Sequence, residues 1–161
     1  MKLVQILSRS IIVFWLIFFS GCVKDKYAPY YEKTGNEWEQ YIYEISDKEK
    51  VTLNNTVLLV LTSSECSPSI DEIKSWDTFN ENSDSIKVQM VILEKYFTTI
   101  QVLLEYEDIG LHVYRDSAYS LIKTDLLPNT PMKVYFDNEG KVKNLSPIGV
   151  SNDPLIFIHG S

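Results

Sequence analysis

Two cysteines carry most of the reactive chemistry that this sequence offers. Cys66 follows a continuous apolar run at residues 56–62 and precedes Pro68, which suits the first turn of a helix. A thiol at a helix start lies near unpaired backbone N–H groups and a partial positive charge, and both favour the nucleophilic thiolate. Because Glu65 opposes this effect and no Lys, Arg or His is adjacent, we expect a modest depression of the Cys66 pKa. The alternative is a buried, inert cysteine.

Cys22 follows a different kind of segment, one that is typical of a bacterial export signal. Residues 11–19 are all hydrophobic, and Lys2 and Arg9 are the only charged residues before Cys22. A basic start followed by a short apolar run is the usual pattern of such signals. Helix over residues 11–19 would rise only about 14 Å, well short of a ~30 Å hydrocarbon core. A permanent transmembrane anchor over residues 3–19 is the alternative.

The residues around Cys22 resemble the lipobox of bacterial lipoproteins, in which small residues precede a cysteine that is acylated and becomes the new N-terminus. Ser20 and Gly21 fit this pattern, whereas Phe19 replaces the usual leucine. The resemblance implies a signal peptide over residues 1–21 and lipid attachment at Cys22. The protein would then be lipid-anchored in the bacterial cell envelope and extracytoplasmic, facing the periplasm or the cell surface. Ordinary secretion with a free Cys22 thiol is the alternative.

The composition excludes several classes of function. The 161 residues are 45 % hydrophobic and 23 % charged, which is typical of a globular protein. The formal net charge of −7 argues against binding to nucleic acid. Two cysteines and two histidines leave no Cys₄ or Cys₂His₂ zinc site, and the chain has no phosphate-binding glycine loop. We therefore expect no metal, no cofactor and no nucleic-acid partner.

The N-terminal part of the mature chain divides into a spacer and the start of a domain. Residues 22–35 are polar and contain Pro29 and Gly35, which predicts a lipid-anchored tether. Residues 36–161 are the predicted domain, which begins with an amphipathic helix. Asn36, with Glu39 three residues later, is the expected N-cap of that helix.

The rest of the domain alternates predicted strands and helices. Apolar and β-branched runs predict strands at 56–62, 86–93 and 111–115, and a hairpin of strands 131–136 and 141–148. Helices are predicted after residue 68, over 97–106 (where a strand is the alternative), and from 116 or 117 to about 125. This order predicts an α/β three-layer sandwich, with a central mixed sheet of about five strands and helices on both faces.

Residues 51–150 resemble a thioredoxin-like protein of the TlpA-like or redoxin branch. The segment Ser64-Glu65-Cys66-Ser67-Pro68-Ser69 follows the buried strand where that family carries Cys-x-x-Cys. Asn129-Thr130-Pro131 resembles the family's cis-proline loop, and the segment 134–142 resembles its terminal hairpin. Two departures matter: Ser69 replaces the second motif cysteine and cannot attack a mixed disulfide, and the family's last helix is missing or short. The N-terminal helix, or a partner, would then cover the gap.

The resemblance implies a site formed by Cys66, Ser67, Ser69, Thr130 and Pro131. In the family the cis-proline loop faces the cysteine. The residue before the proline, here Thr130, pairs its backbone with an extended substrate peptide.

Two functions fit such a site. In the first, Cys66 is a single reactive thiol that exchanges with envelope proteins or small thiols, as a monothiol oxidoreductase or in redox-linked binding. In the second, the chain is a non-catalytic interaction module that keeps the fold and the groove without turnover. A one-cysteine peroxidase is a weaker third reading, because Leu59 stands where the expected proline would be.

Overall fold

The computed structural model of this chain describes residues 26–96, 98–150 and 153–160. The predicted signal peptide and Cys22 lie outside the described residues. Within them, no helix is long and apolar enough to cross a membrane. The elements in chain order are α2 (Ala28–Tyr31), α3 (Gly35–Ile45), β1 (Thr56–Thr62), α4 (Ser63–Cys66), α5 (Ile70–Asn82), β2 (Lys87–Leu93), α6 (Thr98–Tyr106), β3 (His112–Asp116), the 3₁₀ helix η1 (Ser120–Lys123), β4 (Met132–Phe136), β5 (Val142–Pro147) and α7 (Pro154–His159).

The five strands form one mixed sheet in the order β3-β2-β1-β4-β5. Strands β1, β2 and β3 are parallel, whereas β4 and β5 are antiparallel to their neighbours. The parallel half contains the strand–helix–strand units, and the hairpin adds the antiparallel half. The predicted α/β class with a five-stranded mixed sheet is therefore confirmed.

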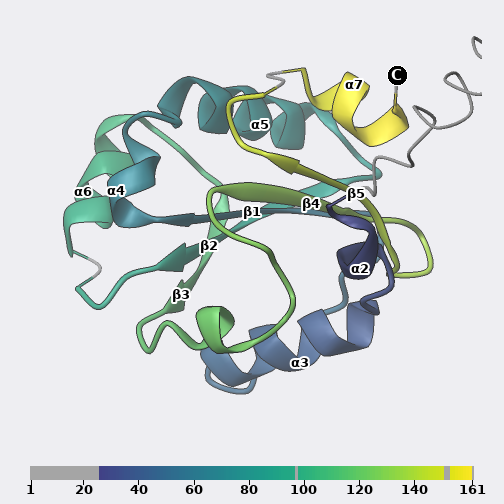
Figure 1. Cartoon of the computed structure of the whole chain (residues 1–161). Coiled ribbons are helices and arrows are strands. Elements are labelled where there is room, and N and C mark those ends of the chain that lie inside the picture. The colour runs from purple at the N-terminus through teal and green to yellow at the C-terminus, as the bar shows by residue number, and fades with distance from the viewer. Residues whose placement is uncertain (1–25, 97, 151–152, 161) are drawn as a thin grey trace, which may run out of the picture.

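Helices cover both faces of the sheet, which explains why every residue of β1 between Thr56 and Thr62 is apolar and buried (Figure 1). Leu58 and Val60 belong to the core on the α3 side, together with Trp38 and Ile42. The alternating residues of β1 belong to the second core, on the side of α5, α6 and α7. Because neighbouring side chains of a strand point to opposite faces, a strand buried on both faces needs an uninterrupted apolar run.

The start of α3 differs from the expected one by two residues. Thr34 is the N-cap, and its backbone N–H donates to Glu37 Oε2 at 2.9 Å. The predicted pair, Asn36 and Glu39, lies inside the helix. Glu39 instead accepts a hydrogen bond from the backbone N–H of Leu53 at 3.0 Å. Thr34/Glu37 and Asn36/Glu39 have the same spacing, so the spacing alone does not distinguish them. The contact of Glu39 with Leu53, which depends on the tertiary fold, leaves Thr34/Glu37 as the capping pair.

The tether predicted over residues 22–35 is wrong for its second half. Residues 28–31 form α2, and the rings of Tyr27, Tyr30 and Tyr31 pack against the core on the α3 side. Thr34 also forms an isolated β-bridge with Lys141, the residue before β5. The segment looks polar in sequence, but its tyrosine rings bury apolar area, and this burial stabilises its packing on the domain.

Two helices in the C-terminal half, η1 and α7, are short. The helix expected up to residue 125 is only η1, because the buried Asp116 carboxylate accepts from the backbone N–H groups of Ser120 and Leu121 at 2.9 Å each. The last helix, α7, has six residues and is capped by Asp153. Helix α3 lies on the opposite face from α7, so it does not cover the gap left by the short last helix (Figure 1).

Gly35 is expected to be a sensitive position for stability. A Cβ atom placed there would collide with the backbone carbonyl of Gly140 in the β4–β5 turn. Gly35→Ala should therefore lower the free energy of unfolding by about 1–3 kcal/mol in urea titrations, because backbone cannot move aside as a side chain can. Gly110→Ala is the matched control. Its Cβ would meet only Asp77 Oδ1, at an ordinary 3.8 Å. Equal losses in the two variants would contradict the expected close approach.

Candidate functional site

The chain leaves β1 through a one-turn helix, α4, that precedes α5. Glu65 caps this turn, because its Oε2 accepts from the Thr62 backbone N–H at 2.7 Å. Cys66 is the last residue of α4, so it does not lie at the start of a helix. The prediction that Cys66 lies at a helix N-terminus is therefore wrong, because the extra turn α4 separates β1 from α5. The spacing Thr62-x-x-Glu65 was the available signal.

The Cys66 thiol is fully buried and protonated. Its exposed fraction is 0 %, and Sγ donates to the carbonyl of Thr62 at 3.5 Å. Burial raises the Cys66 pKa to about 12, and the carboxylates of Glu65 and Glu94 add to the increase. The expected modest depression of the pKa is therefore wrong. Desolvation and two negative charges outweigh any helix-dipole effect.

The predicted proline loop lies against this turn. The Thr130–Pro131 peptide bond is cis, and Thr130 Oγ1 donates to Glu65 Oε1 at 3.2 Å. The Pro131 carbonyl accepts from the backbone N–H of Ile148 at 3.2 Å, which joins the loop to the residue after β5. The structure thus brings together two segments that are 65 residues apart in the sequence. Glu65 is the residue that links them, and the sequence analysis gave it no such role.

The two serines of the motif segment differ in exposure. Ser67 is exposed, whereas Ser69 is half-buried. The Ser69 backbone N–H donates to the carbonyls of Glu65 and Cys66 at 3.2 and 3.1 Å. Ser67 is therefore available to a partner, while Ser69 serves as the junction between α4 and α5.

An apolar cavity of about 260 Å³ adjoins the proline loop. Thr130 is one of its lining residues, and the others come from the end of β2, from η1 and from the segment before the loop. The side chain of Ile122, on η1, is 69 % exposed beside it. The lining is Leu93, Leu121, Ile122, Leu127, Pro128, Asn129 and Thr130.

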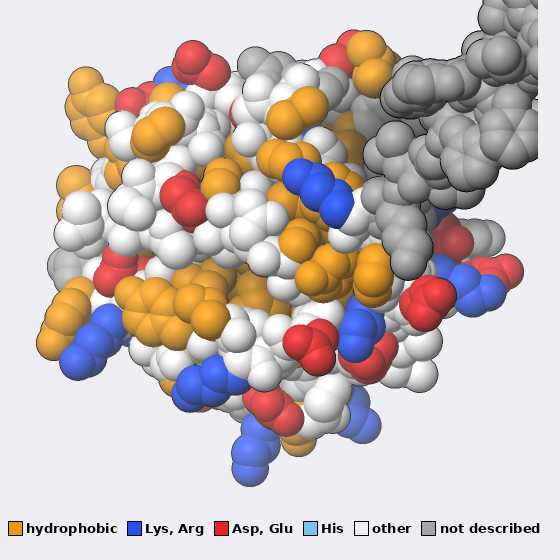
Figure 2. Space-filling model, in the orientation of Figure 1, with side chains coloured by type: hydrophobic (Ala, Val, Ile, Leu, Met, Phe, Trp, Pro, Cys, Tyr) orange, Lys and Arg blue, Asp and Glu red, His pale blue; other side chains and the backbone are white. Residues whose placement is uncertain are grey.

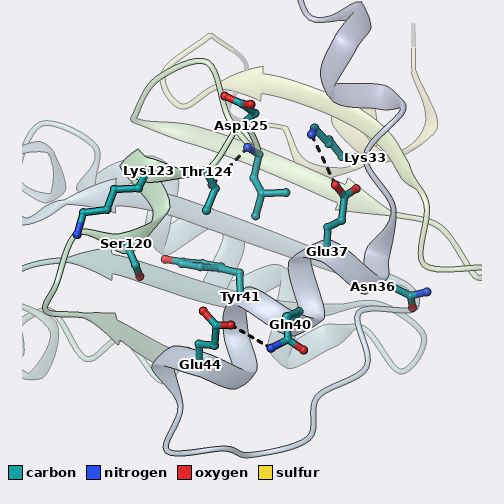
Figure 3. A pocket seen from close by; sticks show the side chains of 11 residues that line it. Lys33, Asn36, Glu37, Gln40, Tyr41, Glu44, Ser120, Lys123, Thr124 and Asp125 are labelled. Atoms are coloured by element: carbon teal, nitrogen blue, oxygen red, sulfur yellow. Dashed lines mark hydrogen bonds and ion pairs between the residues drawn. The ribbon is translucent and has the colours of Figure 1, made fainter.

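A larger and more open hollow, of about 660 Å³, lies between α3 and η1 and contains none of the predicted site residues (Figure 3). Several polar groups that line it have partners within the protein. The Tyr41 hydroxyl donates to Asp116 Oδ2 at 3.1 Å, Lys33 pairs with Glu37, and Gln40 donates to a neighbouring carboxylate. These side chains are therefore already hydrogen-bonded or ion-paired within the protein.

A buried ion pair that no pattern in the sequence predicted lies on the α5 side of the sheet. Lys133 on β4 is 0 % exposed, and its ammonium pairs with the carboxylate of Glu72 on α5, which is 3 % exposed. Glu72 also accepts from the Trp76 indole N–H at 3.3 Å and from the backbone N–H of Gly149. The pair therefore fastens α5 to β4 and to the segment that leads to α7. Among the described residues, no group of acidic, histidine or cysteine side chains is arranged to hold a metal ion.

Glu65→Gln is expected to lower the Cys66 pKa. The substitution removes a negative charge that raises this pKa. The amide oxygen of glutamine can still accept from the Thr62 backbone N–H, and its NH₂ group can donate to the Thr130 hydroxyl. The pH profile of Cys66 alkylation should therefore move to lower pH, because less energy is needed to form a thiolate beside a neutral group. Glu105→Gln, on α6, removes a carboxylate that is not one of those raising the Cys66 pKa, and it should leave the profile unchanged. A profile that does not move in Glu65→Gln would contradict the electrostatic role of Glu65.

The chain was compared with protein families, curated proteins and solved structures. No protein-family model matches the sequence, and no curated protein matches it. Several solved structures resemble the chain. StoA from Bacillus subtilis is 19 % identical with a TM-score of 0.54, covering 68 % of this chain and 87 % of its own. The exposed lipoprotein thioredoxin Etrx1 from Streptococcus pneumoniae is 18 % identical with a TM-score of 0.53, covering 70 % and 85 %.

A putative thiol:disulfide interchange protein DsbE from Chlorobium tepidum is 15 % identical with a TM-score of 0.52, covering 59 % of this chain and 68 % of its own. At such identities the likeness concerns the fold. The five-stranded mixed sheet with helices on both faces agrees with it. The chain therefore has a thioredoxin-like fold.

Proposed function

We propose that this chain is a lipid-anchored, extracytoplasmic interaction module with a thioredoxin-like fold. It is attached to the membrane of the cell envelope through an acylated Cys22. It binds partner proteins at the face around Ser67, Thr130 and Pro131, and it does not turn over disulfides on its own. The observation that carries this proposal is the complete burial of the Cys66 thiol, whose pKa is raised to about 12.

The state of Cys66 argues against a redox cycle within the chain. Only the thiolate attacks a disulfide, and a pKa of about 12 leaves almost none of it at neutral pH. Ser69 stands where a second thiol would resolve a mixed disulfide, and a hydroxyl cannot do so. Both halves of a dithiol–disulfide cycle are therefore impaired.

The proline loop supports a role in binding. The backbone beside Thr130 is the place where an extended peptide would add as a strand. The apolar cavity at Thr130 would accept a side chain of that peptide. Glu65 fixes this loop against α4, so the binding face is preorganised.

Thiol exchange remains the second candidate, because the turn that carries Cys66 lies against the proline loop. A local opening of α4 would be needed to expose Sγ. The Cys66 thiolate would then attack a partner disulfide, form one mixed disulfide and release the partner's other sulfur as a thiolate. A small thiol would have to free Cys66 by a second exchange.

Site-specific photocrosslinking in the cells that make the protein tests the proposal. A photoreactive residue at exposed Ser67 should form adducts with envelope proteins that persist in Cys66→Ala and survive reduction. The matched control is the same photoreactive residue at Val102 on α6, which is 62 % exposed and should give none of these adducts. Adducts that form without irradiation, disappear in Cys66→Ala and are released by dithiothreitol are mixed disulfides, and they would instead establish thiol exchange.

A further inference from the structure

The packed position of α2 restricts how far the domain can stand from a membrane. Tyr27 is already packed against the core, and only five residue steps separate it from Cys22. Five extended residues span at most about 18 Å, whereas a tether over residues 22–35 would span about 50 Å. An acyl chain on Cys22 would therefore hold the α2 side of the domain at the lipid headgroups.

Two further elements, β5 and α7, lie at the same edge of the sheet as α2. Helix α2 packs beside the edge strand β5, and the side chain of Asn144 on β5 donates to the carbonyl of Phe157 on α7. Helices α2 and α7 thus flank β5 from opposite faces of the sheet, while α4 and α6 lie at the other end of the molecule (Figure 1). We call the surface formed by α2, β5 and α7 the β5 flank.

The β5 flank exposes apolar side chains that are not part of either hydrophobic core. Leu155 and Ile156 on α7 are 56 % and 52 % exposed, and Val150 before the helix is 70 % exposed. The buried side of α7 is supplied by Phe157 and Ile158 instead. Figure 2 shows hydrophobic side chains gathered at the surface over β5.

The three tyrosines of the flank suit the interface between lipid and water. Tyr27, Tyr30 and Tyr31 are half-buried, so each presents part of an apolar ring together with a polar group. Such side chains are favoured at the headgroup level of a bilayer.

The charges of the β5 flank have both signs. Lys26 and Lys143 are exposed, but so are Glu139 and Asp153. Removal of residues 1–21 takes away Lys2 and Arg9 and no acidic residue, so the formal net charge falls from −7 for the full chain to −9 for the mature chain. Anionic lipid would therefore repel the body of the protein, and apolar contact has to carry the interaction.

We propose that the β5 flank docks on the lipid bilayer, with Leu155 and Ile156 entering its interface. This inference rests on the proposed attachment at Cys22. Docking turns the end of the domain that carries α4 away from the bilayer, so Ser67 stays accessible to partners.

Hydrogen exchange on anchored protein tests this docking. The chain from Cys22 onward, which contains every described residue, carries Cys66→Ala and is coupled through Cys22 to a maleimide lipid in phosphatidylcholine vesicles. Backbone amides in residues 26–34 and 153–160 should exchange about fivefold more slowly than in uncoupled protein with the same vesicles. Amides in residues 98–106 should not change.

The matched variants separate apolar docking from simple proximity. Leu155→Ser/Ile156→Ser should abolish the slowing in residues 153–160. Val102→Ser/Tyr106→Ser, which alters two exposed apolar residues of α6, should preserve it. Equal exchange in coupled and uncoupled protein, or slowing that appears only with added phosphatidylglycerol, would overturn the proposal. Chemical coupling makes this result independent of acylation in cells, which metabolic labelling of Cys22 with an alkyne fatty acid tests separately.

Discussion

Cys66 in the folded protein is expected to react with iodoacetamide at least a thousandfold more slowly than the same cysteine in urea. A thiol pKa of about 12, against about 8.5 for an exposed thiol, leaves about three thousandfold less thiolate at neutral pH. Burial of Sγ slows the reaction further. The measurement is mass-spectrometric alkylation kinetics on a Cys22→Ser background, so that Cys66 is the only thiol.

The pH dependence of this reaction gives the control. The native rate should rise about tenfold per pH unit through the alkaline range, whereas the unfolded rate should level off above about pH 9. A native rate that is high at neutral pH and levels off there would show a reactive thiolate. That outcome would favour thiol exchange over the proposed interaction module.

The same pKa difference has a consequence for stability. Between about pH 8.5 and about pH 12 the unfolded chain releases the Cys66 proton, while the folded protein keeps it. The unfolded state therefore binds fewer protons in this range, and the free energy of unfolding contributed by Cys66 falls as the pH rises. Cys66→Ala should reduce the alkaline loss of stability relative to the wild type in urea titrations.

Lys133→Met is expected to destabilise the fold more than any other substitution considered above. It removes the partner of Glu72, and both side chains are almost completely buried. A buried carboxylate that loses its cation costs about 3–5 kcal/mol, even with the hydrogen bonds from Trp76 and Gly149 still in place. Urea denaturation followed by circular dichroism measures the loss.

Two further variants show whether the charge or the packing is responsible. Glu72→Leu/Lys133→Met should regain at least half of the loss, because no unpaired charge remains buried. Lys141→Met breaks the exposed pair with Glu139 and should change stability by less than about 0.5 kcal/mol. A Lys133→Met variant as stable as Lys141→Met would show that the buried pair contributes nothing.

Several features of the site were predictable because they depend on local sequence. The apolar run at residues 56–62 predicts the buried strand, and the structure has β1 with the same bounds. The motif around Cys66 and the segment Thr130-Pro131 were both identified from sequence. Their proximity was expected only from the family resemblance, because nothing local relates residues so far apart.

Other features were not predictable, because they arise between distant segments. The carboxylate of Glu94, the residue after β2, raises the Cys66 pKa only because β2 lies beside β1. The pair Glu72–Lys133 joins residues 61 positions apart. Neither Lys133 in a strand nor Glu72 in the first turn of a helix is unusual by itself.

The sequence alone therefore determined the order of the five strands and of the longer helices, the mixed sheet and the serine at position 69. These follow from periodicity, turn residues and residue identity, which act over a few positions. Only the tertiary structure decided that Cys66 is a protonated, buried thiol, that α2 belongs to the domain, and that a lysine is buried beneath α5. Desolvation and Coulomb interactions depend on distances in space, and folding creates those distances between residues that the chain keeps apart.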